Sequence, residues 1–204
     1  MEKGRLEAFS DGVLAVAITL LALNLFIAGP GHGSLFSQLS DHWPAFAAYL
    51  ISFFTIGIIW VNHHELIRQM HIDRIVLFVN LALLLFVVLI PFATATMSAY
   101  LTAGDADAHL AMALYVLVLL GMGLGFGALF ALSLRHKAGA FFQLPKAAQR
   151  YVILRFTVGN ASYLAALIVA FFSPPISLLI VGLTAAYYMV DNTSRRILAG
   201  DSRR

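Results

Sequence analysis

Six long apolar segments divide this chain, and they constrain its fold more than any other feature. They cover about residues 10–28, 43–63, 75–99, 109–132, 151–172 and 174–190. A helix rises about 1.5 Å per residue, so segments of about 17 to 25 residues cross a hydrocarbon core about 30 Å thick. Open strands cannot satisfy their backbone in lipid, and the segments lack the alternation of barrel strands. The sequence therefore predicts an all-α, polytopic membrane protein with six transmembrane helices in a single domain, residues 1–204.

The composition agrees with a membrane protein rather than a soluble one. Hydrophobic residues make up 61% of the chain and charged residues 11%, whereas soluble domains average roughly 45–50% and about 25%. The chain has no cysteine, which excludes disulfides and thiolate metal sites. The formal net charge of +3 does not indicate a nucleic-acid partner, because the basic residues all lie on one side of the predicted membrane.

All basic residues fall on one side of the predicted membrane. They precede the first segment, join the second to the third, flank the connection from the fourth to the fifth, or follow the sixth. The opposite loops carry Asp41, Asp105 and Asp107. The positive-inside rule then predicts a multi-pass protein of the cell (inner) membrane with both termini in the cytoplasm. The 13 basic residues are Lys3, Arg5, Arg68, Arg74, Arg135, Lys137, Lys146, Arg150, Arg155, Arg195, Arg196, Arg203 and Arg204.

The first segment contains an ionisable residue and a stripe of small, apolar and hydroxyl residues at helical spacing. Asp11 lies at the predicted start of this helix, and an ionisable group at such a place is costly to bury and indicates a functional or structural network. Small residues and single hydroxyls on one face favour close helix packing, although the same face could line a pore. Helical spacing alone leaves both interpretations open. The residues of this stripe are Gly12, Val16, Thr19, Leu23 and Phe26.

Three strings in the first hundred residues carry a family resemblance. They are RLEAFSDG at 5–12, WVNHH at 60–64, and NLALLLF at 80–86 followed by LIPF at 89–92. In this order they resemble the transmembrane protein 175 family of potassium channels. Beyond these residues, only the number and placement of the helices match the family.

The resemblance implies a potassium-permeable channel whose pore is lined by the first helix. A chain with one six-helix repeat should form a homotetramer in the lipid bilayer, with the potassium ion as permeant species and no cofactor. The family pattern puts the narrowest ring at Val16, a hydroxyl layer at Thr19 and a further apolar layer at Leu23. The family usually has isoleucine or leucine at the position of Val16. At the position of Ala15, some members with stronger potassium selectivity have serine. We therefore expect a preference for potassium over sodium that is modest.

The same resemblance implies a polar network that anchors the pore helix. Arg5 is six residues from Asp11, so a direct pair between them would form across helices or subunits. The alternative from the residues alone is that Ser10 and Asp11 only cap the N-terminus of the first helix. The residues that the family motif assigns to this network are Arg5, Phe9, Ser10, Asp11, Gly12, Trp60 and His63.

Other patterns do not support catalysis or metal binding. His63, His64, Glu65 and His71 contain no HExxH string, so we expect no metal site there. The string TVGN at 157–160 matches only the start of a carbonyl filter and lies inside a predicted helix. The glycines at 121, 123, 125 and 127 predict close helix packing.

We expect no enzyme, because no catalytic set of side chains converges. A proton-coupled secondary transporter, using Asp11 or His63, is the alternative function, although such transporters usually show internal repeats and broken helices. A structural protein without transport is a third class. Flux measured in liposomes would separate the three.

Overall fold

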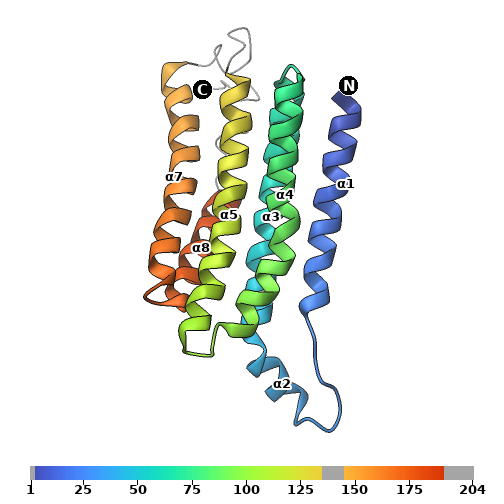
Figure 1. Cartoon of the computed structure of the whole chain (residues 1–204), viewed down its shortest axis with the longest axis vertical. Helices are drawn as coiled ribbons and strands as arrows, with labels where there is room; N and C mark the ends of the chain where they lie inside the picture. Colours follow the sequence, from blue (N-terminus) through green and yellow to red (C-terminus); the bar gives the residue numbers. More distant parts are fainter. Residues whose placement is uncertain (1–2, 135–144, 191–204) are drawn as a thin grey trace.

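The computed structural model describes residues 3–134 and 145–190, and these residues form a bundle of helices (Figure 1). Five of the helices are long and apolar enough to cross a membrane, and α8 is a shorter apolar helix of 17 residues. The all-α, polytopic architecture is therefore as predicted. The elements are α1 Lys3–Leu21, η1 Ala22–Asn24, α2 Leu35–Asp41, α3 Trp43–Gln69, α4 Arg74–Tyr100, α5 Ala106–Ser133, α7 Lys146–Ala170 and α8 Pro174–Val190.

The helices pack largely in chain order. α4 packs against α5, α5 against α7 and α7 against α8, while α8 also returns to contact α3. The first helix, α1, packs on α3 and α4. Figure 1 shows α1 at one edge of the bundle and α7 at the opposite edge. This arrangement leaves one side of α1 without a neighbour among the other described helices.

Local sequence signals explain where several helices begin. Asp73 accepts a hydrogen bond from the backbone N–H of Val76 at 2.8 Å, which caps α4. Asp105 caps α5 in the same way through the N–H groups of Asp107 and Ala108. Such side chains satisfy backbone donors that the first turn leaves free. Proline stands at the start of α3 and of α8, where its missing N–H costs nothing.

Glycines in α5 allow close contact with α4. A Cβ on Gly125 would lie 3.1 Å from the Cα of Leu83, and one on Gly121 would lie 2.3 Å from the ring of Phe86. The predicted role of these glycines in close packing is confirmed. Gly127 differs, because nothing lies within 4 Å of the position its Cβ would take.

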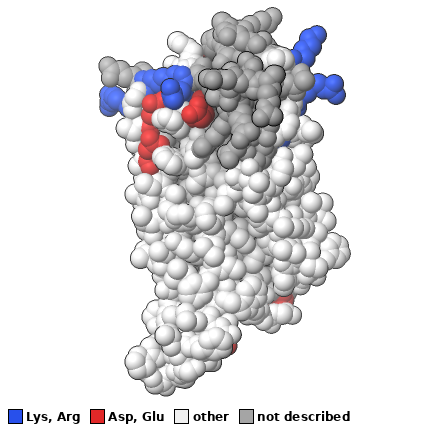
Figure 2. Space-filling model, turned by 180° about the vertical axis from the view of Figure 1, so that it is seen from behind, with Lys and Arg blue, Asp and Glu red and all other residues white. Residues whose placement is uncertain are grey.

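Charged residues are distributed unequally between the two ends of the bundle. Figure 2 shows the described Lys and Arg side chains gathered at one end, which is where α1 begins and α3 ends. There the Lys3 ammonium donates a hydrogen bond to the carbonyl of Arg68. Six of the basic residues used for the predicted orientation fall outside the described ranges: Arg135, Lys137, Arg195, Arg196, Arg203 and Arg204.

The boundaries of the first helix differ from those predicted. α1 begins at Lys3, not near residue 10, and it gives way to the η1 turn and then to coil at Leu25, not residue 28. Leu6 continues the buried face toward the N-terminus, but the polar residues around it hide this from a hydropathy scan. At the other end Gly29 and Gly31 have φ values of 87° and 95°, which a helix cannot contain.

The predicted position of Asp11 at the start of a helix is consequently wrong. Asp11 lies about two turns inside α1. The first-turn N–H groups that a cap would satisfy belong to residues near Lys3, so Ser10 and Asp11 do not cap this helix. Their side chains instead contact neighbouring helices.

Candidate functional site

The two faces of α1 have different environments. The face toward α3 and α4 carries the buried residues of the helix. Their spacing of three or four residues keeps them on one side of the helix. Four of the five are apolar, so this face attaches α1 to the bundle mainly by packing. The buried residues are Leu6, Ser10, Leu14, Ala17 and Leu21.

The opposite face carries the predicted stripe and is exposed within the chain. Val16 is 57% exposed, Leu23 76% and Phe26 69%. Gly12 and Thr19 are exposed as well. The stripe is therefore no packing seam between described helices of one chain. Only Gly12, Val16 and Thr19 lie on the α-helix itself, because Leu23 belongs to η1 and Phe26 to the following coil.

The hydroxyl of Thr19 has a defined orientation. Its O–H donates a hydrogen bond to the carbonyl of Val16 at 2.8 Å. A hydroxyl has one proton and two lone pairs, so this bond uses the donor and leaves the oxygen free to accept. The exposed face of α1 therefore presents an oxygen that can contact a cation, one turn from Val16.

A buried chain of hydrogen bonds joins α1, α3 and α4. The amide of Asn80 donates to the hydroxyl of Ser10 at 3.0 Å, and Asn80 Oδ1 lies 2.7 Å from His63 Nε2. Because Asn80 Oδ1 can only accept, His63 Nε2 carries the proton in this bond. Ser10 and Asn80 have no exposed surface and His63 has 1%. One polar group from each helix thus finds its partner inside the bundle.

A second contact fixes α1 at its surface. Trp60 Nε1 donates a hydrogen bond to Asp11 Oδ1 at 2.9 Å, and Trp60 is 47% exposed. A carboxylate acceptor strengthens such a bond. Asp11 follows Ser10 directly, so adjacent residues hold α1 to its neighbours in different directions. Together the two contacts fix the rotation of α1 about its axis, and hence the direction in which Val16 and Thr19 face.

The structure thus brings together four of the seven residues assigned to the anchoring network, with Asn80 in addition. Asn80 belongs to the string NLALLLF that carried the family resemblance, but it was not assigned to the network. Its contacts depend on how three helices pack, which the sequence alone does not show. The other three, Arg5, Phe9 and Gly12, are exposed on α1. Within residues 3–134 and 145–190, Arg5 has no hydrogen bond or ion pair, so it does not pair with Asp11 in one chain.

The histidines near the end of α3 do not assemble a metal site in the part of the chain that is described. No three His, Asp or Glu side chains there come together. Glu65 lies 3.9 Å from Arg68, and both side chains are well exposed.

Apolar spans, unequally charged ends and a rotationally fixed edge helix with an exposed apolar stripe define a polytopic helical membrane protein. The family model described as "Endosomal/lysosomal potassium channel TMEM175" matches residues 5–91. A potassium channel of Streptomyces collinus is 41% identical over 191 residues, covering 92% of this chain and 91% of that protein. The chain therefore belongs to the TMEM175 family.

Other relatives agree with this assignment. The crystal structure of a lysosomal potassium-selective channel TMEM175 homolog from Chamaesiphon minutus superimposes with a TM-score of 0.77 at 32% identity, covering 93% of this chain and 97% of that one. The endosomal/lysosomal proton channel TMEM175 of Gallus gallus is 43% identical over 75 residues, which are 32% of this chain and 15% of that protein.

Proposed function

We propose that this chain is the subunit of a potassium-permeable channel of the cell membrane, which conducts passively through a pore lined by α1. The observation that carries this proposal is the exposed stripe on a helix of fixed rotation. Val16 is 57% exposed in a single subunit, although its neighbour Ala17 is 1% exposed. The relatives over nearly the whole chain are potassium channels by name.

A homotetramer accounts for the exposed face of α1. The helix lies at the edge of the bundle, so four copies can bring their first helices to a common axis (Figure 1). Closed cyclic symmetry requires each subunit to present the same surface. In this arrangement Val16, Thr19 and Leu23 of each subunit form successive rings along the axis. Arg5, which has no hydrogen bond or ion pair among the described residues, then lies where a neighbouring subunit can supply a partner.

The rings give a physical basis for selecting potassium. An apolar collar at Val16 forces an ion to lose part of its hydration shell, and potassium releases water at lower cost than sodium. The Thr19 oxygen, whose proton is engaged with the Val16 carbonyl at 2.8 Å, replaces part of the lost hydration. Valine has a smaller side chain than isoleucine or leucine and leaves a wider aperture, so the preference for potassium is modest. The same collar can close the pore by dewetting.

The ends of the bundle are consistent with both termini in the cytoplasm. The described basic residues gather at the end where α1 begins (Figure 2). Asp11 lies toward that end of α1, so its carboxylate raises the local concentration of cations at the cytoplasmic mouth. The contact with Trp60 at 2.9 Å holds it there. A proton-coupled transporter is not favoured, since the relatives are named as channels.

Flux in liposomes tests this proposal. Purified protein should pass potassium down its gradient faster than sodium, without saturable coupling to protons. Val16→Ala should widen the collar and reduce the ratio of potassium to sodium flux. The matched control is Val158→Ala, the same change at a residue 40% exposed on α7 at the opposite edge of the bundle. Equal flux ratios in wild type, Val16→Ala and Val158→Ala would contradict a collar at Val16.

A further inference from the structure

The short helix α2 lies at the end of the bundle opposite the described Lys and Arg side chains (Figures 1 and 2). Figure 1 shows it beyond the ends of α4 and α5, on the connection from α1 to α3. α2 has seven residues, and one of them, Gln38, is buried. The other six are exposed within the chain. Their chemistry therefore decides what the outer surface of α2 contacts.

The side chain of Gln38 fixes the rotation of α2. Gln38 Oε1 accepts a hydrogen bond from the N–H of Gly29 at 3.1 Å. Gln38 Nε2 donates to the carbonyl of Gly29 at 3.0 Å and to that of Gly33 at 3.3 Å. Both glycines have positive φ values, 87° and 92°, a conformation that other residues rarely adopt. One face of α2 is thus held against the connection that follows η1, and its other faces point away.

The outward residues of α2 form a polar face and an apolar face. Ser37 and Asp41 are one turn apart, and the Ser37 hydroxyl donates to Asp41 Oδ2 at 3.3 Å. Successive residues of a helix are about 100° apart, which puts Leu35, Phe36 and Leu39 together on the other side. Leu35 is 62% exposed and Phe36 82%. Such a separation is typical of a helix that lies in the plane of a membrane interface.

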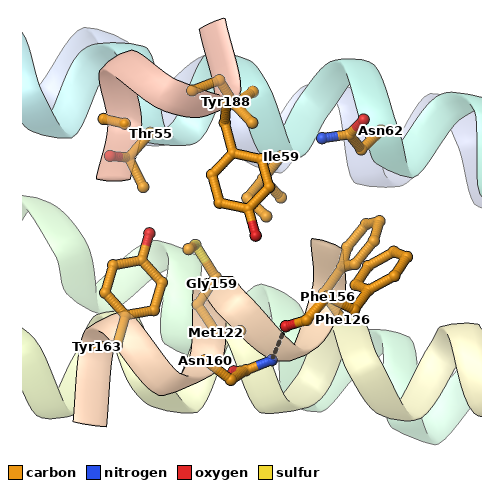
Figure 3. A pocket seen from close by; sticks show the side chains of 13 residues that line it. Thr55, Ile59, Asn62, Met122, Phe126, Phe156, Gly159, Asn160, Tyr163 and Tyr188 are labelled. Atoms are coloured by element: carbon orange, nitrogen blue, oxygen red, sulfur yellow. Dashed lines mark hydrogen bonds between the residues drawn. The ribbon is translucent and has the colours of Figure 1, made fainter. Parts of the chain in front are cut away.

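A cavity inside the bundle is too far from α2 to receive this apolar face. The cavity measures about 60 Å³, is partly open, and is lined by residues of α3, α5, α7 and α8, with Asn160 of α7 among them (Figure 3). On α3 the lining begins at Thr55, twelve residues after Trp43. Twelve helical residues rise about 18 Å. Leu35, Phe36 and the rest of the apolar face therefore remain at the surface of the chain.

The apolar face of α2 adjoins the membrane-crossing surface of α3. His42 alone separates α2 from α3, and Trp43–Arg68 is long and apolar enough to cross a membrane. Trp43, Leu50 and Phe54 are all exposed, and their spacing of seven and four residues keeps them on one side of α3. Tryptophan is enriched where a membrane meets water. Trp43 therefore marks a membrane boundary directly beside α2.

Charge and size both favour lipid over a protein partner for this face. Residues 34–42 contain no Lys or Arg, so α2 offers no cation to an anionic headgroup or to an acidic protein surface. A helix of seven residues is about 10 Å long. Stable protein–protein interfaces bury about 800 Å² on each partner, which three side chains of so short a helix cannot supply alone.

We propose that α2 docks in the membrane interface and inserts Leu35, Phe36 and Leu39 among the acyl chains of the nearer leaflet. Ser37 and Asp41 face the water. Gln38, through its three hydrogen bonds, connects this lipid-held helix to the connection that leads from the first helix. The attraction is hydrophobic, so a zwitterionic lipid is sufficient. This inference depends on the membrane-spanning fold and not on the proposed pore.

Fluorescence quenching in phosphatidylcholine liposomes tests this orientation without any measurement of ion flux. The chain has no cysteine, so Leu35→Cys and Ser37→Cys each carry a single bimane label. The two residues are about 200° apart on the helix and form a matched pair. Lipids brominated on their acyl chains should quench the label at 35 and place it about 5–10 Å into the boundary between headgroups and acyl chains. Aqueous iodide should quench the label at 37 instead.

A further substitution and a second labelling site complete the test. Phe36→Ser should reduce the quenching of the label at 35 by brominated lipid, because it removes the most exposed side chain of the apolar face. Size-exclusion elution shows which variants fold, and Leu39→Cys replaces Leu35→Cys if the latter does not.

Three outcomes would overturn the proposal. Strong iodide quenching of both labels would place α2 in water. Protection of the label at 35 from both quenchers would show that protein covers the apolar face. Equal quenching of both labels by brominated lipid would show that α2 has no fixed orientation at the membrane.

Discussion

The indole nitrogen of Trp60 lies 2.9 Å from a carboxylate oxygen of Asp11, and this bond joins α3 to α1 five residues before Val16. Beside it, the Ser10 hydroxyl accepts from Asn80 at 3.0 Å inside the bundle. The rotation of α1 therefore depends on one exposed and one buried contact. The direction of Val16 follows from that rotation, which is how residues distant from the proposed collar act on it.

Removing the Trp60 donor should alter conduction more than stability. Trp60→Phe keeps an aromatic ring but loses the bond to Asp11, which costs about 1 kcal/mol of unfolding free energy at so exposed a site. Potassium flux in liposomes should fall as α1 gains rotational freedom. Trp43→Phe is the control, because Trp43 is 49% exposed and Trp60 is 47% exposed. An identical flux in both variants would argue against a positioning role for Trp60.

The buried contact should matter more to stability. Asn80→Ala removes the partner of both Ser10 and His63, leaving polar groups with at most 1% exposure unsatisfied. We expect a loss of about 1–3 kcal/mol, measured by thermal unfolding in detergent. Leu81→Ala, at the exposed neighbouring residue, should change stability much less. Equal losses would show that the hydrogen bonds of Asn80 contribute little.

The Thr19 hydroxyl should affect permeation without affecting the fold. Thr19→Val keeps the branched shape but removes the oxygen that stands one turn from Val16, so the preference for potassium should decrease. Thr19→Ser keeps the oxygen and the bond to the Val16 carbonyl. Reversal potentials in mixed potassium and sodium solutions measure the difference. If the valine and serine variants select equally, the hydroxyl layer has no part in selection.

A second buried cluster should contribute to stability alone. Ser52 lies 2.8 Å from the Thr94 hydroxyl and 2.9 Å from that of Tyr115, and it joins α3 to α4 and α5. Ser52→Ala leaves the Tyr115 hydroxyl without its partner, so the free energy of unfolding should fall by about 1–3 kcal/mol. Tyr115→Phe removes the hydroxyl itself and should cost less. A larger loss in Tyr115→Phe would contradict this order.

Close contact between α4 and α5 predicts a contrast between two glycines. Gly125→Ala would place a Cβ 3.1 Å from the Leu83 Cα, where only movement of a helix relieves the contact. We expect a loss of about 1–3 kcal/mol. Gly127→Ala meets open space and should be neutral or stabilising, since alanine favours the helix. Thermal unfolding of the two variants measures this difference in stability. If Gly125→Ala were as stable as Gly127→Ala, the contact with Leu83 would be easily relieved.

Hydropathy was sufficient to predict the apolar helices, because lipid requires long continuous apolar runs. It failed at the start of α1, where Lys3, Arg5 and Glu7 surround the buried Leu6, and this failure misplaced Asp11 at a helix end. Spacing did identify the stripe through Val16, yet it could not show whether the stripe was packed or exposed. That distinction depends on the neighbours of α1.

Contacts between helices that are far apart along the chain could not be predicted, for a similar reason. Asn80 stands out as a polar residue in an apolar run, but its pairing with Ser10 and His63 requires three helices to meet at one level. The cavity beside Asn160 depends on four helices, and the local string around it suggested only a fragment of a filter. Periodicity identifies the face of a helix, whereas packing decides what that face contacts.

The central claim is that Val16 faces the ion pathway, and a single introduced cysteine tests it most directly. The chain contains no cysteine, so Val16→Cys supplies the only thiol. The account predicts that a positively charged, water-soluble thiol reagent blocks potassium flux through Val16→Cys and leaves Val158→Cys conducting. Unchanged flux after complete reaction of Val16→Cys, or equal block of both variants, would contradict it.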